Sequence, residues 1–256
     1  MDRRKYWDEN YLKYWKDKVQ EANSEQELRL NKNDIKTISD DIVFDYCDMI
    51  PLKEGDAVLD FGCGFCRTYD YFENRKVKYF GIDISQAMIS ESKKNHTELL
   101  DRLFVAEGEK LPFQENMFDF LLCFGVFDAC YQEIALYEML RVLKIGGILL
   151  LTGKNDNYYA DDEKAIIAEE KAREKGHPNY FTDTVSMIKQ LKERNIEIRE
   201  SFYFERRGNF STGTATKEMP KNFYEYLLIM QKKEEGSNRQ FDKFSSDYSK
   251  TFKEKV

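Results

Sequence analysis

The sequence predicts an α/β fold with a mostly parallel sheet, preceded by a helical cap. Short apolar segments alternate with helical ones from about residue 39 onward, which is the rhythm of βαβ units. Most of these apolar segments show no polar alternation, so both faces of each strand should be buried, as in a parallel sheet. Residues 1–38 instead combine high charge with a single aromatic stripe.

Seven segments are candidate strands. The first five are AVLDF from Ala57, VKYFGID from Val77, RLFVAE from Arg102, FDFLLCFG from Phe118 and GILLLTG from Gly147. The last two, IEIRESFYFER and KNFYEYLLIMQKK, are longer and are expected to pair at the end of the sheet.

Three intervening stretches show helix signals. SQAMISESKKN begins with Ser85 as a candidate N-cap, and YQEIALYEMLRVLK is expected to end before Gly146 and Gly147. DTVSMIKQLKERN, from Asp183, is the third. These segments connect the strands and are read as packing elements.

The pattern divides the chain into three regions. Residues 1–38 form the cap or lid, residues 39–231 the main domain with inserts at 154–181 and 206–220, and residues 232–256 a charged tail. The two terminal regions each carry an aromatic pattern at helical spacing: Trp7, Tyr11, Trp15 and Val19 in the cap, and Phe241, Phe244, Tyr248 and Phe252 in the tail. For the cap, a lid over a ligand and plain packing on the sheet edge both remain open. For the tail, docking on the main domain and disorder both remain open.

Composition excludes several classes of function. A net charge of −7 and a pI near 5.2 argue against a broad phosphate-binding surface, so no nucleic-acid partner is expected. No apolar stretch is long enough to span a bilayer, and the charged N-terminus is unlike a signal peptide, which favours a cytoplasmic protein without a membrane partner. Five cysteines, an odd number, favour reduced thiols over a disulfide framework.

The segment AVLDFGCGFC carries the first ligand signal. A strand that ends at Asp60 and continues through Gly62 and Gly64 into a helix lets the backbone approach a ligand closely. Arg67 stands where a dinucleotide fingerprint needs its third glycine, so an ordinary NAD site is disfavoured. Cys63 and Cys66 have no second Cys-x-x-Cys pair, so no metal site is expected.

Two further carboxylates end the next strands. Asp83, 23 residues after Asp60, suits two ribose hydroxyls, although a loop aspartate that caps the next helix is the alternative. Glu107 suits an adenine amino group, with the Gly108 backbone at the ring edge. Three carboxylates at successive strand ends predict a crevice at the carboxyl edge of the sheet, where such folds bind ligands.

These residues resemble the class I S-adenosylmethionine-dependent methyltransferases of the small-molecule type. The resemblance runs from about Val58 to Asn155 and rests on VLDFGCGFC, YFGIDISQAMI, VAEGEKLPFQENMFDFLLCFGVF and MLRVLKIGGILLLTG. It implies a Rossmann-like sheet of seven mostly parallel strands with the last strand antiparallel, helices on both faces, and S-adenosylmethionine as cofactor. It also assigns the cofactor contacts: Asp60, Gly62, Cys63 and Gly64 to the methionine part, Asp83 and Ile84 to the ribose, Glu107 and Gly108 to the adenine, and Phe124 and Gly125 to the sulfonium side.

The chain departs from the family in two places. Cys66 replaces the usual third glycine of the turn, which would narrow the pocket or shift the start of the helix. Many relatives have a histidine shortly after strand four, where this chain offers Asp128, Cys130 and Tyr131. The identity of a general base is therefore open.

Catalytic and acceptor candidates lie in the cap, after strand four and in the inserts. His177 is a candidate base or substrate contact, or else a loop residue stiffened by Pro178, and Asp128 is the second catalytic candidate. The candidate acceptor contacts are Tyr11, Trp15, Tyr131, Asn155, Tyr158 and Arg206.

The function expected first is methyl transfer from S-adenosylmethionine to a hydroxyl or amine of a small molecule, such as a sugar or another pathway intermediate, by a monomer or homodimer. The alternatives are a protein or RNA methyltransferase that docks through the cap and tail, and a regulatory protein that binds the cofactor without transferring the methyl group.

Overall fold

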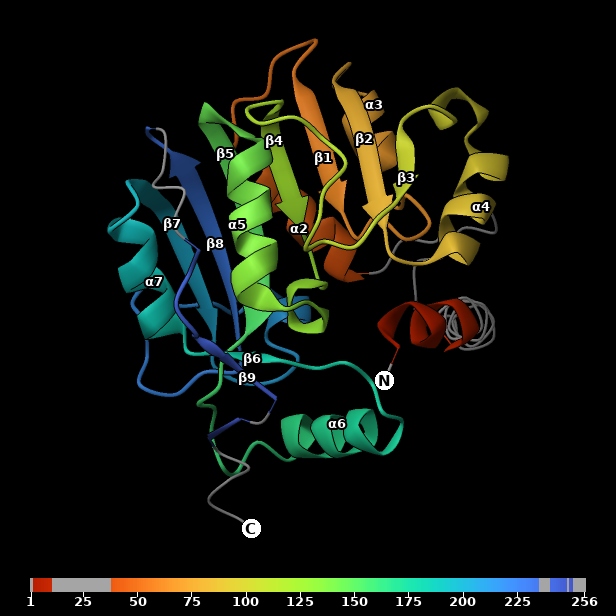
Figure 1. The fold of residues 1–256 in the computed structure, drawn as a ribbon. Coiled ribbons are helices and arrows are strands. Elements are labelled where there is room, and N and C mark those ends of the chain that lie inside the picture. The colour runs from red at the N-terminus through yellow and green to blue at the C-terminus, as the bar shows by residue number, and fades with distance from the viewer. Residues whose placement is uncertain (1, 11–37, 235–239, 248, 251–256) are drawn as a thin grey trace. The chain divides into compact units, whose positions relative to one another are not determined.

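The computed structural model describes residues 2–10, 38–234, 240–247 and 249–250 (Figure 1). The chain divides into two compact units, residues 1–108 and 109–256. Tyr11, Trp15, Val19, Tyr248 and Phe252 lie outside the described residues. The acceptor contacts expected of Tyr11 and Trp15 therefore stay predictions.

The first unit contains three parallel strands. Its described elements are a helix over residues 3–10, α2 (Ile38–Cys47), β1 (Ala57–Phe61), α3 (Tyr69–Glu73), β2 (Lys78–Asp83), α4 (Gln86–Asn95), η1 (Thr97–Leu99) and β3 (Leu103–Val105). β2 pairs in parallel with β1 on one side and with β3 on the other. α3 packs on β2, and α4 packs on β2 and β3 (Figure 1).

The second unit contains the remaining strands of the main sheet. Its elements are β4 (Phe118–Cys123), η2 (Phe127–Ala129), α5 (Gln132–Val142), β5 (Leu143–Lys154), α6 (Glu163–Glu174), β6 (Phe181–Thr182), α7 (Thr184–Lys192), β7 (Ile196–Phe204), η3 (Phe210–Thr212), β8 (Glu225–Lys232) and β9 (Ser245–Ser246). β4 and β5 are parallel, and β8 runs antiparallel to both β5 and β7. The sheet order is β3-β2-β1-β4-β5-β8-β7, which confirms the predicted seven-stranded, mostly parallel sheet with an antiparallel last strand.

Continuous apolar segments became the central strands, as expected for strands covered on both faces. Phe120 to Cys123 in β4 and Leu149 to Leu151 in β5 are fully buried. The predicted N-cap is also present, since the Ser85 hydroxyl accepts a hydrogen bond from the backbone N–H of Met88 at 3.2 Å. Burial on both faces and the cap explain why this part of the fold was readable from sequence.

The two glycines after α5 have a different role from the predicted one. α5 ends at Val142, and Leu143 already pairs with Phe118 of β4. Gly146 and Gly147 then lie inside β5, where the pairing register shifts. Gly146 has a φ of +82°, and a Cβ on Gly147 would lie 2.9 Å from the carbonyl oxygen of Lys144. The glycines therefore form a bulge in a strand and do not stop the helix.

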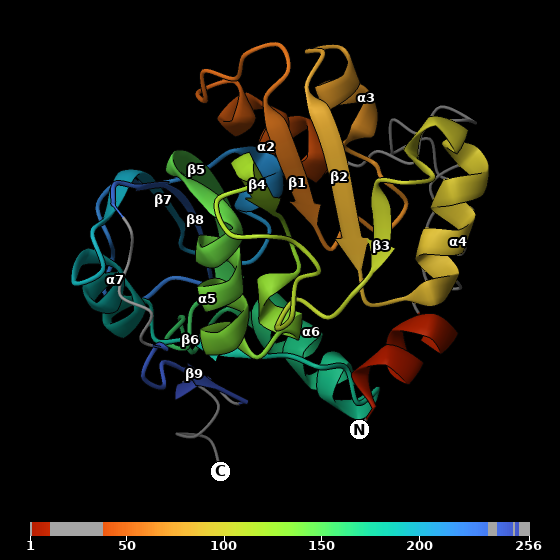
Figure 2. The same ribbon diagram turned by 45° about the horizontal axis from the view of Figure 1, so that its top comes forward.

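The tail docks on the second unit over residues 240–247, in extended and not helical form. β9 pairs with β6 of the first insert, and the two strands lie side by side (Figure 2). The Glu133 carboxylate of α5 accepts hydrogen bonds from the backbone N–H groups of Phe244 and Ser245, both at 2.7 Å. Phe241 and Phe244 are buried. Strand pairing thus orders this part of the tail.

Candidate functional site

The turn after β1 has the backbone conformation that its glycines allow. Gly62 and Gly64 have φ values of +78° and +52°. The backbone N–H groups of Gly62 and Cys63 both donate to the carbonyl oxygen of Ile82 at 2.8 Å, which ties the turn to the end of β2. Cys66 also has a positive φ, +56°, so it takes the conformation of the glycine it replaces. For a residue with a Cβ this costs about 1–2 kcal/mol.

Asp60, near the end of β1, connects the turn to α3 and to β2. It is 5% exposed, and its carboxylate accepts hydrogen bonds from the Thr68 hydroxyl and, at 2.7 Å, from the Tyr79 hydroxyl. Thr68 precedes α3 and Tyr79 lies in β2. Asp60 therefore positions the start of α3 and the second strand around the turn.

Asp83 fixes the same turn from the end of β2. Its Oδ2 accepts from the Gly64 N–H at 3.0 Å, and its Oδ1 accepts from the Ser85 N–H at 2.9 Å. Burial raises the pKa of Asp83 to about 6, against the lowering effect of these two bonds. Each carboxylate oxygen can accept two hydrogen bonds, so each keeps one acceptor site beyond the bond described. That capacity fits the two hydroxyls of a ribose, and Ile84 beside it is half-buried.

Gly108 lies where the backbone after β3 meets the end of β1. A Cβ on Gly108 would lie 2.1 Å from Cζ of Phe61, so no side chain fits there without displacing that ring. Glu107, the residue before it, is exposed, and its carboxylate lies 3.4 Å from Nη2 of Arg4. The first unit thus offers a glycine turn, a buried carboxylate and a backbone segment without Cβ, and these fit the adenosyl group that the sequence predicts.

In the second unit, the chain leaves β4 through Phe124 and Gly125. The Gly125 N–H donates to Thr152 Oγ1 of β5 at 2.8 Å, and its φ is +67°. The ring of Phe124 stacks on Phe210, with centroids 5.6 Å apart and planes at 26°. Phe210 belongs to the 206–220 insert, so this insert contacts the strand end that the sequence predicts to be functional.

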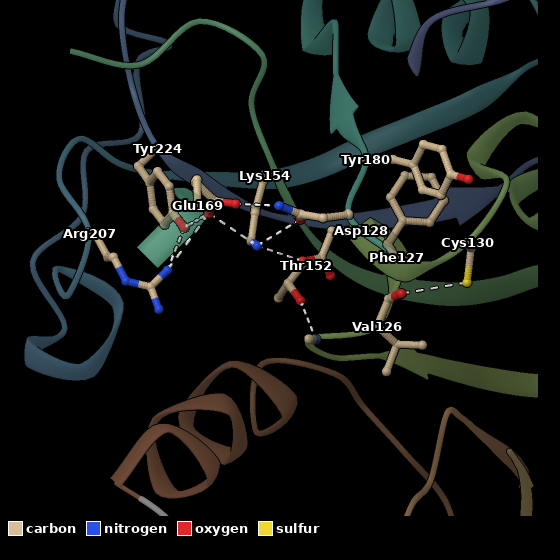
Figure 3. A network of polar contacts seen from close by, with 12 residues as sticks. Val126, Phe127, Asp128, Cys130, Thr152, Lys154, Glu169, Tyr180, Arg207 and Tyr224 are labelled. Carbon is tan, nitrogen blue, oxygen red and sulfur yellow. Dashed lines mark hydrogen bonds and ion pairs between the residues drawn. The ribbon is translucent and has the colours of Figure 1, made fainter. Parts of the chain in front are cut away.

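A buried network of charged side chains lies at the end of β5 (Figure 3). Lys154 Nζ is 2.9 Å from Oδ2 of Asp128 and 3.2 Å from Oε1 of Glu169. Glu169, from α6, also accepts a hydrogen bond from the Tyr224 hydroxyl, to which Arg207 donates. The side chains of Lys154, Asp128 and Glu169 are 16%, 14% and 1% exposed, so these three charged groups are shielded from water.

The network keeps its charges because they compensate one another. Burial opposes ionisation of Asp128, but the charge and hydrogen bond of Lys154, together with His177 and a backbone hydrogen bond, hold the pKa of Asp128 below its ordinary value. Burial likewise opposes the charge on Lys154, and Asp128, Tyr224 and Glu169 together raise the pKa of Lys154 well above its ordinary value. Glu225, the cross-strand neighbour of Lys154, has its pKa raised to about 7 by burial.

His177 belongs to the same environment. It is half-buried, and burial lowers the pKa of His177 below the ordinary 6.5, while the Asp128 carboxylate partly opposes this shift. The imidazole is therefore neutral at pH 7 and able to accept a proton. This is the state that a general base requires.

Proton NMR of the two histidines, His96 and His177, will measure this shift. We expect a pKa below 6.5 for His177, and a still lower one in Asp128→Asn, because the charge that favours the imidazolium is removed. A His96→Gln variant assigns the signals and leaves the His177 titration unchanged. A pKa of His177 at or above 6.5 would contradict the buried, neutral imidazole. Since unfolding raises the pKa of such a histidine, its effect on stability grows unfavourable as the pH falls below 6.5.

The other predicted acceptor residues differ in how far they are exposed to solvent. Asn155 and Tyr158 are 4% and 1% exposed, and the Asn155 amide bonds to the backbone of Asn157 and Phe223. Both therefore contribute to packing inside the unit. Tyr131, by contrast, is 47% exposed.

Arg206 connects the two inserts. Its guanidinium donates to both carboxylate oxygens of Asp161, at 2.6 and 3.2 Å. The adjacent backbone N–H of Arg207 donates to Asp162 Oδ2 at 2.8 Å. Arg206 therefore clamps the insert 206–220 to the insert 154–181.

Sequence reasoning missed four members of the network: Lys154, Glu169, Arg207 and Tyr224. Lys154 had a usable signal, because a lysine directly after a buried strand needs a counter-ion. Glu169 had none, since it is one of four glutamates mixed with lysines and an arginine in EKAIIAEEKAREK.

Within its described residues, the chain shows neither a cluster of metal ligands nor a helix that could span a membrane. No group of three or more His, Cys, Asp or Glu side chains there is arranged to hold a metal ion. No helix within it is long and apolar enough to cross a membrane.

The central part of the chain is similar to known methyltransferases. A family model described as "Methyltransferase domain" matches residues 59–151. A ubiquinone/menaquinone biosynthesis C-methyltransferase from Neisseria gonorrhoeae is 33% identical over 106 residues, which are 39% of this chain and 43% of that protein. The chain thus spans less than half of this relative.

Two solved structures share the fold. A methyltransferase in complex with the Trm112 activator from Haloferax volcanii aligns with a TM-score of 0.57 and 17% identity, over 75% of this chain and 89% of that one. A geranyl diphosphate C-methyltransferase from Streptomyces coelicolor aligns with a TM-score of 0.58 and 14% identity, over 76% and 77% of the two chains.

Proposed function

Because residues 59–151 form a class I S-adenosylmethionine-dependent methyltransferase domain, we propose that the chain transfers a methyl group from this cofactor to a hydroxyl or amine of a small molecule. The observation that carries the proposal is the pairing of a glycine turn with the buried carboxylate of Asp83, which accepts from the Gly64 N–H. The carboxylate suits the two hydroxyls of a ribose, and the glycine turn lets the backbone approach the rest of an adenosyl ligand closely.

The first unit supplies the cofactor contacts in this proposal. Asp83 receives the ribose hydroxyls, the Gly108 backbone and Glu107 receive the adenine, and the turn at Gly62 to Gly64 receives the methionine part. S-adenosylmethionine, when bound, supplies a methyl group activated by its cationic sulfur. The protein's own task is to align an acceptor and exclude water.

The second unit supplies the acceptor contacts. His177 accepts the proton that a hydroxyl loses as it attacks the methyl group, or that a neutral amine loses once its nitrogen has been methylated, and Asp128 stabilises the imidazolium that results. Lys154 and Glu169 hold Asp128 in place, and Phe124 with Phe210 provides an apolar wall. A small acceptor is supported by the names of the Neisseria and Streptomyces proteins, both of which refer to small molecules.

Calorimetric titration with S-adenosylmethionine, S-adenosylhomocysteine and NAD tests the cofactor. We expect micromolar binding of the first two and none of NAD. Labelled methyl transfer to panels of sugars, amines, phenols, RNA and protein then tests the acceptor. Transfer confined to small molecules supports the proposal, transfer to RNA or protein contradicts its second half, and absence of cofactor binding contradicts all of it.

A further inference from the structure

The N-terminal helix, residues 3–10, is attached to the first unit through Asp8. Oδ1 of Asp8 accepts a hydrogen bond from the Ser85 hydroxyl at 2.7 Å and another from the Ala87 N–H at 3.1 Å. Both donors lie at the beginning of α4, whose first N–H groups have no partner within the helix. Asp8 therefore acts as a second cap of α4, supplied by a segment nearly 80 residues away in sequence.

The same serine leads directly to the predicted cofactor contacts. Its backbone N–H donates to Asp83 Oδ1, and Asp83 Oδ2 accepts from the Gly64 N–H. A continuous series of hydrogen bonds thus runs from Asp8 through Ser85 and Asp83 to the glycine turn. Any displacement of Ser85 changes the orientation of the Asp83 carboxylate.

A second contact lies one turn earlier on the helix. Nη2 of Arg4 is 3.4 Å from the carboxylate of Glu107, the predicted adenine contact. Both side chains are about half exposed, 50% and 48%, so this pair contributes little energy by itself. The pair matters because it helps to orient the helix. Arg4 and Asp8 lie on one face of the helix and contact the chain after two different strands, β3 and β2.

From this arrangement we infer that Asp8 is a positioning residue of the cofactor site, which couples docking of the N-terminal helix to cofactor binding. The inference rests on the proposed function. A ligand that fixes Asp83 also fixes Ser85, and thereby favours the docked helix. By linkage, the docked helix strengthens ligand binding by the same factor.

The test compares Asp8→Ala with Glu9→Ala, a matched control on the same helix. Glu9 is exposed and pairs only weakly with Lys5, at 3.9 Å, and its removal changes the net charge equally. Calorimetry with S-adenosylhomocysteine should give a dissociation constant about fivefold higher for Asp8→Ala, the lower end for coupled sites, and one near the wild-type value for Glu9→Ala. Asp8→Leu also removes both acceptor oxygens at a similar side-chain size, and it serves if the alanine variant does not fold.

Hydrogen exchange of peptides covering residues 2–10 gives an independent readout. S-adenosylhomocysteine should slow their exchange in the wild type and in Glu9→Ala, but not in Asp8→Ala. Equal dissociation constants and equal protection in the two variants would overturn this inference while leaving the proposed function intact. A wild type that binds neither S-adenosylhomocysteine nor S-adenosylmethionine would overturn both.

Discussion

Replacing Lys154 with methionine should lower the free energy of unfolding by about 3–5 kcal/mol, the cost of removing one partner from a buried ion pair. Lys154 is the cation between Asp128 and Glu169, and the Glu169 side chain is 1% exposed. Methionine fills similar space but leaves the Asp128 carboxylate without its compensating charge. Scanning calorimetry is the suitable measurement of this loss. Tryptophan fluorescence would report mainly on the N-terminal region, because both tryptophans, Trp7 and Trp15, lie there.

Lys144 provides the matched control, since it lies in the same strand and also pairs with an aspartate. Its partner is Asp119 at 2.7 Å, but the two side chains are 42% and 28% exposed. Lys144→Met should therefore cost less than about 1 kcal/mol. Similar losses in the two variants would show that burial of the network does not decide its energy.

The Lys154→Met deficit should shrink as the pH falls. Lys154 holds the pKa of Asp128 low in the wild type, so that contribution to stability is present above the unfolded pKa and is lost as the pH falls through the folded one. In the variant the Asp128 carboxylate binds a proton more readily, which removes the uncompensated charge. A deficit independent of pH would point to lost packing instead.

Asp83→Ala should weaken binding of S-adenosylhomocysteine by about 1.5–3 kcal/mol, the range for hydrogen bonds to a charged group. The dissociation constant then rises roughly 10- to 150-fold. Calorimetry of the folded variant makes the measurement. Unchanged affinity would remove the ribose assignment of Asp83.

Asp83 also holds Gly64 and Ser85, so the loss of ligand bonds must be separated from a disturbed turn. An analogue of the ligand without ribose hydroxyls does this. It should bind the wild type more weakly and lose little further affinity in Asp83→Ala. Equal losses for both ligands would mean that the mutation acts only through the turn.

The pH dependence of binding has a definite sign. The pKa of Asp83 is about 6 in the free protein, and hydroxyl donors favour the ionised form. Wild-type affinity should therefore fall as the pH drops below 6, and binding near pH 6 should release protons. Asp83→Asn should show neither effect.

The fold was predictable because its strongest signals are local. The centres of the strands β4 and β5 are apolar, and Ser85 directly precedes a helix, which is the usual place of an N-cap serine. The glycine bulge in β5 was misread, since Gly146 and Gly147 after a helix have the same sequence signature as a helix stop. Only the pairing of Leu143 with Phe118 distinguishes the two.

For the candidate site, only the placement of the residues at the ends of β1 and β2 could be predicted from the sequence, and their contacts with a cofactor stay predictions. Gly62 and Gly64 lie in the turn directly after β1, and Asp83 is the last residue of β2, so their position in the chain fixes their position at the sheet edge. Glu169 and Arg207 come from the two inserts, and what brings them to Tyr224 is tertiary packing that no periodicity reveals. The hydrogen bond between Ser85 and Asp8 of the helix at residues 3–10 is likewise a long-range contact that no sequence pattern predicts.

The pairing of β9 with β6 has a consequence for the order of folding. These strands are more than 60 residues apart in sequence, and α7, β7 and β8 lie between them. Such distant contacts form slowly, because the chain loses the conformational entropy of a long loop before the strand hydrogen bonds form. The segment that contains β6 therefore gains its strand partner only after the chain around Ser245 has been synthesised, so the two-stranded β6–β9 sheet forms late in folding.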